Sequence, residues 1–354
     1  MKKELLVASA LVSTLGMAGV AEAATATMSG SAINGVVGKD LDSTANDSTA
    51  ATQLGKFSVS LSETTDGGVK ISTGFDLTNE SDAVTDVSGV TLTFNDGSKL
   101  DLVEAGTASG SHVASVPGAS GQQGISGTTT NAAPGSLTMG NSADSVGFEY
   151  HTAADAFGID GFKASVSASF NGDTSSVTGT TAVLENSYSA GVTYVTDAGD
   201  TTVTIAGGVQ NAEYNNSTAT MDTETYQIGL SAVNGDLTVG VGYADGDFIR
   251  TGDGSSTGRS AMQVSNASFA KAGVKYVSGD MTFSLGTTSA EGKDEALGAA
   301  ATSTADSKDS TSASVDYAVA SGVTATLGWT DVTDGDEGTT STNTSGSSWD
   351  IGAT

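Results

Sequence analysis

The chain has 354 residues, a formal net charge of −28 and no cysteine. The absence of cysteine excludes disulfide bonds, thiolate metal sites and cysteine nucleophiles. A charge of this sign and size repels nucleic acid, so nucleic acid is not an expected partner.

The N-terminus has the pattern of a secretory signal peptide. Two lysines follow Met1, residues 5–20 are mostly apolar, and residues 21–23 read Ala-Glu-Ala, the small-residue pattern of a cleavage site. A membrane anchor is the competing interpretation, but the apolar stretch is short for a spanning helix and no similar run follows it. We therefore expect residues 1–23 to be removed and residues 24–354 to form the exported protein.

The mature chain repeats one pattern in windows of about ten residues, in which every second position is apolar. Phe57, Val59 and Leu61 alternate with polar residues, and the alternation resumes after the turn at 64–68. Such strands present one face to an apolar medium and the other to water. Sixteen segments share the pattern: 25–37, 52–63, 69–79, 87–95, 97–104, 145–152, 161–170, 187–196, 201–211, 223–233, 236–245, 266–277, 280–289, 309–319, 322–332 and 346–354. We predict an all-β fold, a closed antiparallel transmembrane β-barrel of 16 strands.

Connections of two kinds alternate along the chain. The short ones carry the Gly and Asp that favour hairpin turns, and the long ones are rich in Ser, Thr, Gly and Asp. This predicts short periplasmic turns and long extracellular loops. The longest connection, 105–144, contains both prolines of the chain, Pro117 and Pro134. Because compact domains seldom keep a structureless loop of this length without a function, this loop is a candidate functional element.

The charged residues of the predicted strands fall on the polar phase of the alternation. A lysine facing lipid near the bilayer midplane costs about 2–4 kcal/mol, whereas one facing a watery lumen costs little. The residues predicted to line the lumen are Lys56, Lys70, Asp76, Lys99, Asp101, Glu149, Lys163, Lys271, Lys275, Asp316 and Asp350.

Three stretches resemble the sixteen-stranded general porins of Gram-negative bacteria, especially the alphaproteobacterial kind. Residues 57–77, FSVSLSETTDGGVKISTGFDL, are similar to the second and third strands of that family with their T-x-D-x-G turn. Residues 90–102, VTLTFNDGSKLDL, resemble the hairpin before its constricting loop, and residues 27–32, TMSGSA, are similar to its first strand. The resemblance implies an outer-membrane homotrimer whose water-filled pores pass ions and small hydrophilic solutes by diffusion, with loop 105–144 folded inward.

That loop departs from the family in its charge. Between residues 105 and 143 it has no Asp, Glu, Lys or Arg, and its notable polar side chains are His112, Gln122 and Gln123. We predict that these three belong to the constriction, and that the electric field in the pore comes mostly from wall residues.

Two other functions stay open. Outer-membrane barrels can be enzymes, and His151 adjoins Glu149 among many serines, although neither His112 nor His151 has a metal-ligand or triad spacing. A secreted surface-layer or adhesin-type β protein would also be rich in Gly, Ser, Thr and Asp. A solenoid of that kind would show a fixed repeat period, which the unequal loops lack.

Expected ligands and partners are few. No cofactor is expected, but the acidic runs Asp245-Gly246-Asp247 and Asp334-Gly335-Asp336-Glu337 offer the oxygens that Ca²⁺ prefers. Neither run has EF-hand spacing. The expected partners are outer-membrane lipid, lipopolysaccharide and two further copies of the chain.

Overall fold

The structure is a computed structural model, and it describes the chain in eleven stretches. These are residues 25–41, 48–78, 86–87, 89–102, 107–118, 145–171, 183–216, 219–250, 262–296, 304–334 and 345–354. The predicted signal peptide, the two constriction-loop glutamines Gln122 and Gln123, and the acidic residues Asp336 and Glu337 lie outside the described residues.

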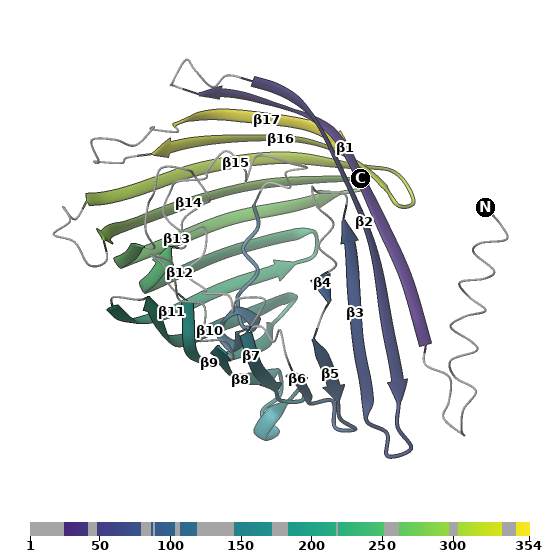
Figure 1. The fold of residues 1–354 in the computed structure, drawn as a ribbon. Helices are drawn as coiled ribbons and strands as arrows, with labels where there is room; N and C mark the ends of the chain where they lie inside the picture. The colour runs from purple at the N-terminus through teal and green to yellow at the C-terminus, as the bar shows by residue number, and fades with distance from the viewer. Residues whose placement is uncertain are drawn as a thin grey trace.

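The described residues form one antiparallel sheet that closes on itself (Figure 1). Its strands are β1 (Thr25–Leu41), β2 (Ser48–Thr64), β3 (Lys70–Thr78), β4 (Asp86–Val87), β5 (Val90–Thr93), β6 (Lys99–Leu102), β7 (Ser145–His151), β8 (Phe162–Asn171), β9 (Val183–Ala198), β10 (Thr201–Asn216), β11 (Ala219–Asn234), β12 (Leu237–Arg250), β13 (Met262–Ser278), β14 (Met281–Ala296), β15 (Thr304–Ala320), β16 (Val323–Asp334) and β17 (Gly346–Ala353). Two short helices accompany them, α2 (Ala108–Ser111) and the 3₁₀ turn η1 (Ala156–Gly158). No helix in the described stretches is long and apolar enough to cross a membrane.

The barrel has sixteen strand positions, as predicted. Each strand pairs with its neighbour in sequence, and β17 returns to pair with β1, where Val37 lies opposite Asp350. The fragments β4 and β5 both pair with β3 and therefore occupy a single position in the wall. The predicted segment 87–95 is thus one interrupted strand, and the closed antiparallel barrel is confirmed.

The strands extend further toward the long connections than the alternation predicts. The sequence predicts 187–196 and 201–211, whereas β9 begins at Val183 and β10 ends at Asn216. The segment predicted to end at Asp245 continues as β12 to Arg250, so Gly246 and Asp247 lie in the strand and not in the connection after it. A hairpin that continues beyond the bilayer keeps its backbone ladder but has water on both faces. Its side chains then show no apolar phase, so the pattern ends before the strand does.

The two faces of the wall differ in the way that the alternation predicts. Large apolar side chains such as Val241, Leu285 and Leu327 point outward and are about half exposed. On the opposite face the buried side chains are mostly small or polar, for example Ser167, Ser189 and Thr326. Among the described residues the barrel therefore has no central apolar core, and their large apolar side chains face outward.

A tight turn between β5 and β6 illustrates the short connections. Gly97 has a φ of 87°, in the left-handed region that glycine adopts at little cost. The Oδ1 atom of Asp96 accepts hydrogen bonds from the backbone N–H of Ser98 at 2.9 Å and from its hydroxyl at 2.7 Å. Gly and Asp thus have the turn roles that the sequence predicts.

Candidate functional site

One described part of loop 105–144, Thr107–Gly118, runs along the inside of the barrel, and we call it the inner segment (Figure 1). It begins with the single turn of α2, whose N-cap Thr107 accepts a hydrogen bond from the backbone N–H of Gly110 at 3.2 Å. α2 lies against β7, β8, β9 and β10. The described beginning of the loop is thus packed against four neighbouring strands of the wall.

Wall side chains supply hydrogen bonds to the backbone of α2. Ser167 Oγ accepts from the backbone N–H of Ala108 at 3.0 Å, and Ser189 Oγ accepts from that of Ser109 at 3.2 Å. The amide of Gln227 donates to the carbonyl oxygen of Ser109. The first N–H groups of a helix have no partner within the helix, so the inward serines of β8 and β9 satisfy them.

A row of inward-facing glycines allows the inner segment to pack closely against the wall. At Gly208 a Cβ atom would lie 2.6 Å from Ser109 Cα, and at Gly240 it would lie 2.6 Å from the carbonyl oxygen of Ser115. The row, which we call the glycine row, consists of Gly191, Gly208, Gly229, Gly240, Gly273 and Gly286, one on each strand from β9 to β14. Any larger residue at these positions would push the inner segment away from the wall.

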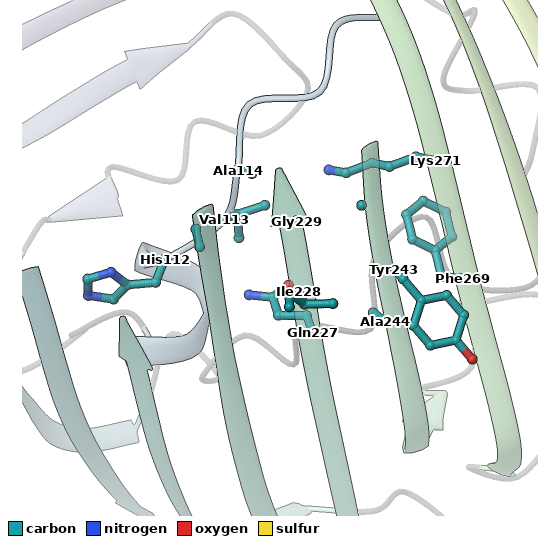
Figure 2. Close-up of a pocket in the computed structure, with 12 residues that line it drawn as sticks. His112, Val113, Ala114, Gln227, Ile228, Gly229, Tyr243, Ala244, Phe269 and Lys271 are labelled. Atoms are coloured by element: carbon teal, nitrogen blue, oxygen red, sulfur yellow. The ribbon is translucent and has the colours of Figure 1, made fainter. Parts of the chain in front are cut away.

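A cavity of about 40 Å³ remains between the inner segment and the wall (Figure 2). Its lining includes Val113 and Ala114 of the segment, and Gln227, Phe269 and Lys271 of the wall. Because one water molecule needs about 10–15 Å³ of such a cavity, there is room for a few water molecules. The cavity is too small to admit a hydrophilic solute.

His112 fixes the C-terminal end of α2 to the wall. Its Nδ1 atom lies 2.7 Å from Thr193 Oγ1, and its Nε2 atom lies 2.8 Å from Ser165 Oγ. Burial lowers the pKa of His112, and the positive charges of His151 and Lys163 lower it further. The imidazole is therefore held neutral, as a hydrogen-bonding anchor. We predict that His112 belongs to the constriction, and its hydrogen bonds attach the inner segment to the wall.

Beside this anchor, the pairing of β6 with β7 brings three ionisable side chains together. Asp101 lies opposite Glu149, and Lys99 lies opposite His151. His151 Nε2 is 2.9 Å from Asp101 Oδ2 and 3.7 Å from Glu149 Oε1. The Ser111 hydroxyl of the inner segment donates to Glu149 Oε1 at 2.6 Å. The alternation predicts Asp101 and Glu149 as lumen residues, but it does not indicate that they meet His151.

Ser165, His151 and Asp101 form a hydrogen-bonded line that has the connectivity of a catalytic triad. Ser165 Oγ lies 2.8 Å from His151 Nδ1. However, Ser165 is only 3% exposed, and its hydroxyl is shared with His112. A nucleophile must reach a substrate carbonyl, and this serine is covered by the inner segment. The arrangement therefore serves as an attachment.

The other residues that we predict to line the lumen have different surroundings. Lys56 Nζ and Asp76 Oδ2 form an ion pair at 2.6 Å with both side chains exposed. Asp316 accepts a hydrogen bond from Thr326 at 2.6 Å, and Asp350 is completely buried. Five of the predicted lumen lysines form no ion pair within 4.0 Å in the described stretches: Lys70, Lys99, Lys163, Lys271 and Lys275.

Sequence reasoning missed the residues that hold the inner segment. The glycine row and Ser165, Ser167 and Ser189 occupy polar-phase positions, where small residues look unremarkable in an alternating strand. A signal did exist, because glycine recurs at inward positions on neighbouring strands. Glycine weakens a strand, so its repetition there indicates that another part of the chain approaches closely.

Comparisons with known proteins agree with this architecture. The family model described as Gram-negative porin matches residues 7–337. The chain belongs to the Gram-negative porin family. The comparison with curated protein sequences gave no match.

Solved structures share the fold of this porin at low sequence identity. A porin refined at 1.8 Å resolution is 17% identical with a TM-score of 0.61, covering 93% of this chain and 99% of its own. A variant of OmpT, an outer membrane protein of Vibrio cholerae, that lacks one loop is 14% identical with a TM-score of 0.60, covering 94% and 99%. A variant of the Rh. blastica porin is 14% identical with a TM-score of 0.58, covering 93% and 99%.

Proposed function

We propose that this porin forms a water-filled channel through which ions and small hydrophilic solutes cross the outer membrane by passive diffusion. The observation that supports this most directly is the inner segment, which is held against the inside of a closed barrel by Ser167, Ser189 and His112. A segment placed there narrows the passage, so the inner segment is the proposed constriction.

The barrel itself has the properties that a channel requires. Backbone polar groups in a bilayer must be satisfied within the protein, and a sheet meets this condition only when it closes. Sixteen strands enclose a lumen too wide for side chains to fill, so water occupies it. The outward apolar side chains, such as Leu285 and Leu327, provide a surface for lipid.

The charge in the pore should come from the wall. Among the described residues of the inner segment, His112 is the one titratable side chain, and its surroundings keep it neutral. The inward lysines and carboxylates, including the exposed pair Lys56 and Asp76, then set the field that ions meet. Because the two signs are mixed along the wall, we expect modest ion selectivity.

The remaining features of the proposal follow the family. We propose a homotrimer in contact with outer-membrane lipid and lipopolysaccharide, exported through cleavage of residues 1–23. We propose no enzymatic activity and no cofactor, since the triad-like Ser165 is covered by the inner segment. A secreted adhesin is the alternative, and the outward apolar surface favours the membrane channel over it.

Conductance in a planar bilayer tests the proposal. Replacement of residues 107–140 by a short Gly/Ser linker should raise the single-channel conductance, because it removes the constriction. Shortening the connection 335–344 in the same way is the control, and we expect the conductance to stay close to that of the wild type. Equal conductance of the wild type and the 107–140 variant would show that the inner segment is not the constriction.

A further inference from the structure

We propose that Asp101, Glu149 and His151 form a binding site for a divalent transition-metal ion such as Zn²⁺. The three side chains project from the inner face of β6 and β7, and their ligand atoms all lie within 4.8 Å of one another. Binding of the ion does not depend on the channel function proposed above.

The spacing of the ligand atoms fits a metal ion of this class. Zinc binds imidazole nitrogen and carboxylate oxygen at about 2.0–2.2 Å, which places tetrahedral ligands about 3.3–3.6 Å apart. His151 Nε2 lies 2.9 Å from Asp101 Oδ2 and 3.7 Å from Glu149 Oε1, on either side of that range. An ion between these atoms would need only small side-chain movements.

Each of the three ligands is already oriented by a hydrogen bond from a neighbour. His151 Nδ1 meets Ser165 Oγ at 2.8 Å, which leaves Nε2 directed at the carboxylates. Ser111 donates to Glu149, and Thr91 donates to Asp101. Outer partners of this kind fix the ring orientation and carboxylate positions in metal sites.

The charge balance also favours a cation. Glu149 is only 2% exposed, and a buried carboxylate is costly unless it is paired or binds a metal ion. Within the described stretches the basic group nearest to Glu149 is His151, at 3.7 Å, and the same imidazole nitrogen lies closer to Asp101, at 2.9 Å. Lys99 and Lys163 lie on the same inner face, but neither is within 4.0 Å of Glu149.

The donor set indicates the class of metal. Ca²⁺ and Mg²⁺ take oxygen ligands, whereas imidazole suits Zn²⁺, Fe²⁺, Ni²⁺ and Cu²⁺. One imidazole with two carboxylates therefore selects a transition-metal ion over Ca²⁺, whose preferred oxygen ligands the acidic run Asp245-Gly246-Asp247 offers. Three protein ligands leave one position of a tetrahedral ion for water.

The site lies where the wall holds the inner segment. Glu149 accepts the hydrogen bond of Ser111, and Ser165 connects His151 with His112. A bound ion would hold the wall side chains of this attachment in place.

Direct Zn²⁺ binding tests the proposal. The full chain, without a polyhistidine tag, is folded in detergent, stripped with EDTA and titrated with Zn²⁺ in competition with a chromophoric chelator. Millimolar Ca²⁺ is present throughout to occupy surface carboxylates. We expect one Zn²⁺ per chain, and Co²⁺ in its place should give the visible absorption bands of a low-symmetry site. Absence of stoichiometric Zn²⁺ from the wild-type protein would overturn the proposal.

Variants assign the bound ion to this site. His151→Ala should weaken Zn²⁺ binding by more than about 100-fold, because loss of an outer partner alone costs about 10- to 100-fold. Glu149→Gln and Asp101→Asn, which keep the side-chain shape, should also weaken binding, and they decide the matter if His151→Ala does not fold. Heat-modifiable migration on a gel shows which variants are folded.

Two matched controls use the remaining histidine and an acidic residue elsewhere. His112→Ala removes the only other imidazole, and Asp245→Asn removes a carboxylate on β12. Both should leave the Zn²⁺ affinity within about tenfold of the wild type, since neither side chain contacts the three ligands. Loss of binding in either control equal to that in His151→Ala would show that the ion binds elsewhere.

Discussion

The inner face of the barrel has two regions that use the same alternation differently. Beneath the inner segment, β8 to β14 present serine and the glycine row, for example Ser167 and Gly240. On β2 and β3 the inward positions instead carry the exposed ion pair of Lys56 and Asp76. The difference shows that an inward position is shaped by what it faces: a packed chain requires small residues, and water permits long charged ones.

The largest expected effect follows from filling the packed region. In Gly273→Val the new side chain overlaps the carbonyl oxygen of Pro117, and overpacking of this kind typically costs about 1–3 kcal/mol. The free energy of unfolding in urea, measured for the protein folded in lipid vesicles, checks this. The same bulk added by Ala272→Val points outward and should have little effect. If the two variants were equally stable, the glycine row would not hold the segment.

We expect a smaller loss of unfolding free energy when a hydrogen bond that anchors the inner segment is removed without adding bulk between the segment and the wall. Ser165→Ala leaves the imidazoles of the buried His112 and the partly exposed His151 without their shared partner, and one unsatisfied buried group costs about 1–3 kcal/mol. Urea unfolding of the vesicle-folded protein is again the measurement. Ser60→Ala, at an exposed inward position of β2, is the control. An equal loss in both variants would mean that the anchor contributes nothing beyond an ordinary wall hydroxyl.

Substitutions of the exposed ion pair on β2 and β3 should change the ion selectivity and hardly change the stability. Exposed ion pairs contribute at most about 1 kcal/mol, so Lys56→Ala should change the unfolding free energy by less than that. The variant should instead shift the reversal potential in a KCl gradient toward cation preference, because one positive charge leaves the lumen. Asp76→Asn should shift it the opposite way. Shifts of the same sign would show that these side chains do not face the ion path.

Much of the wall could be predicted because its cause is local. The alternation at Phe57, Val59 and Leu61 follows from the two different media on either side of a strand. It can be recognised without knowing which distant residues the strand contacts. The sixteen strand positions followed from that alternation, from the spacing of the turns and from the family resemblance.

The contacts across the wall could not be predicted, because they depend on register across a long connection. Asp101 and Glu149 are 48 positions apart in the sequence, and their pairing is set only when β6 and β7 align on either side of loop 105–144. A shift of one residue would move every side chain to the other face. The meeting of Glu149 with His151 and Ser111 is therefore a property of the assembled barrel.

The smallest expected effect lies outside both regions, in the turn between β5 and β6. Hydrogen bonds from Ser98, first from its hydroxyl and then from its backbone N–H, hold the pKa of Asp96 below its ordinary value. A carboxyl group whose pKa is lower in the folded state stabilises the fold above its unfolded pKa, and this contribution is lost as the pH falls through the folded value. Ser98→Ala should therefore be slightly less stable than the wild type at neutral pH and equal to it in strong acid. Urea unfolding at the two pH values checks this, and a difference that persists in acid would assign the loss to packing of Ser98 instead of to the charge of Asp96.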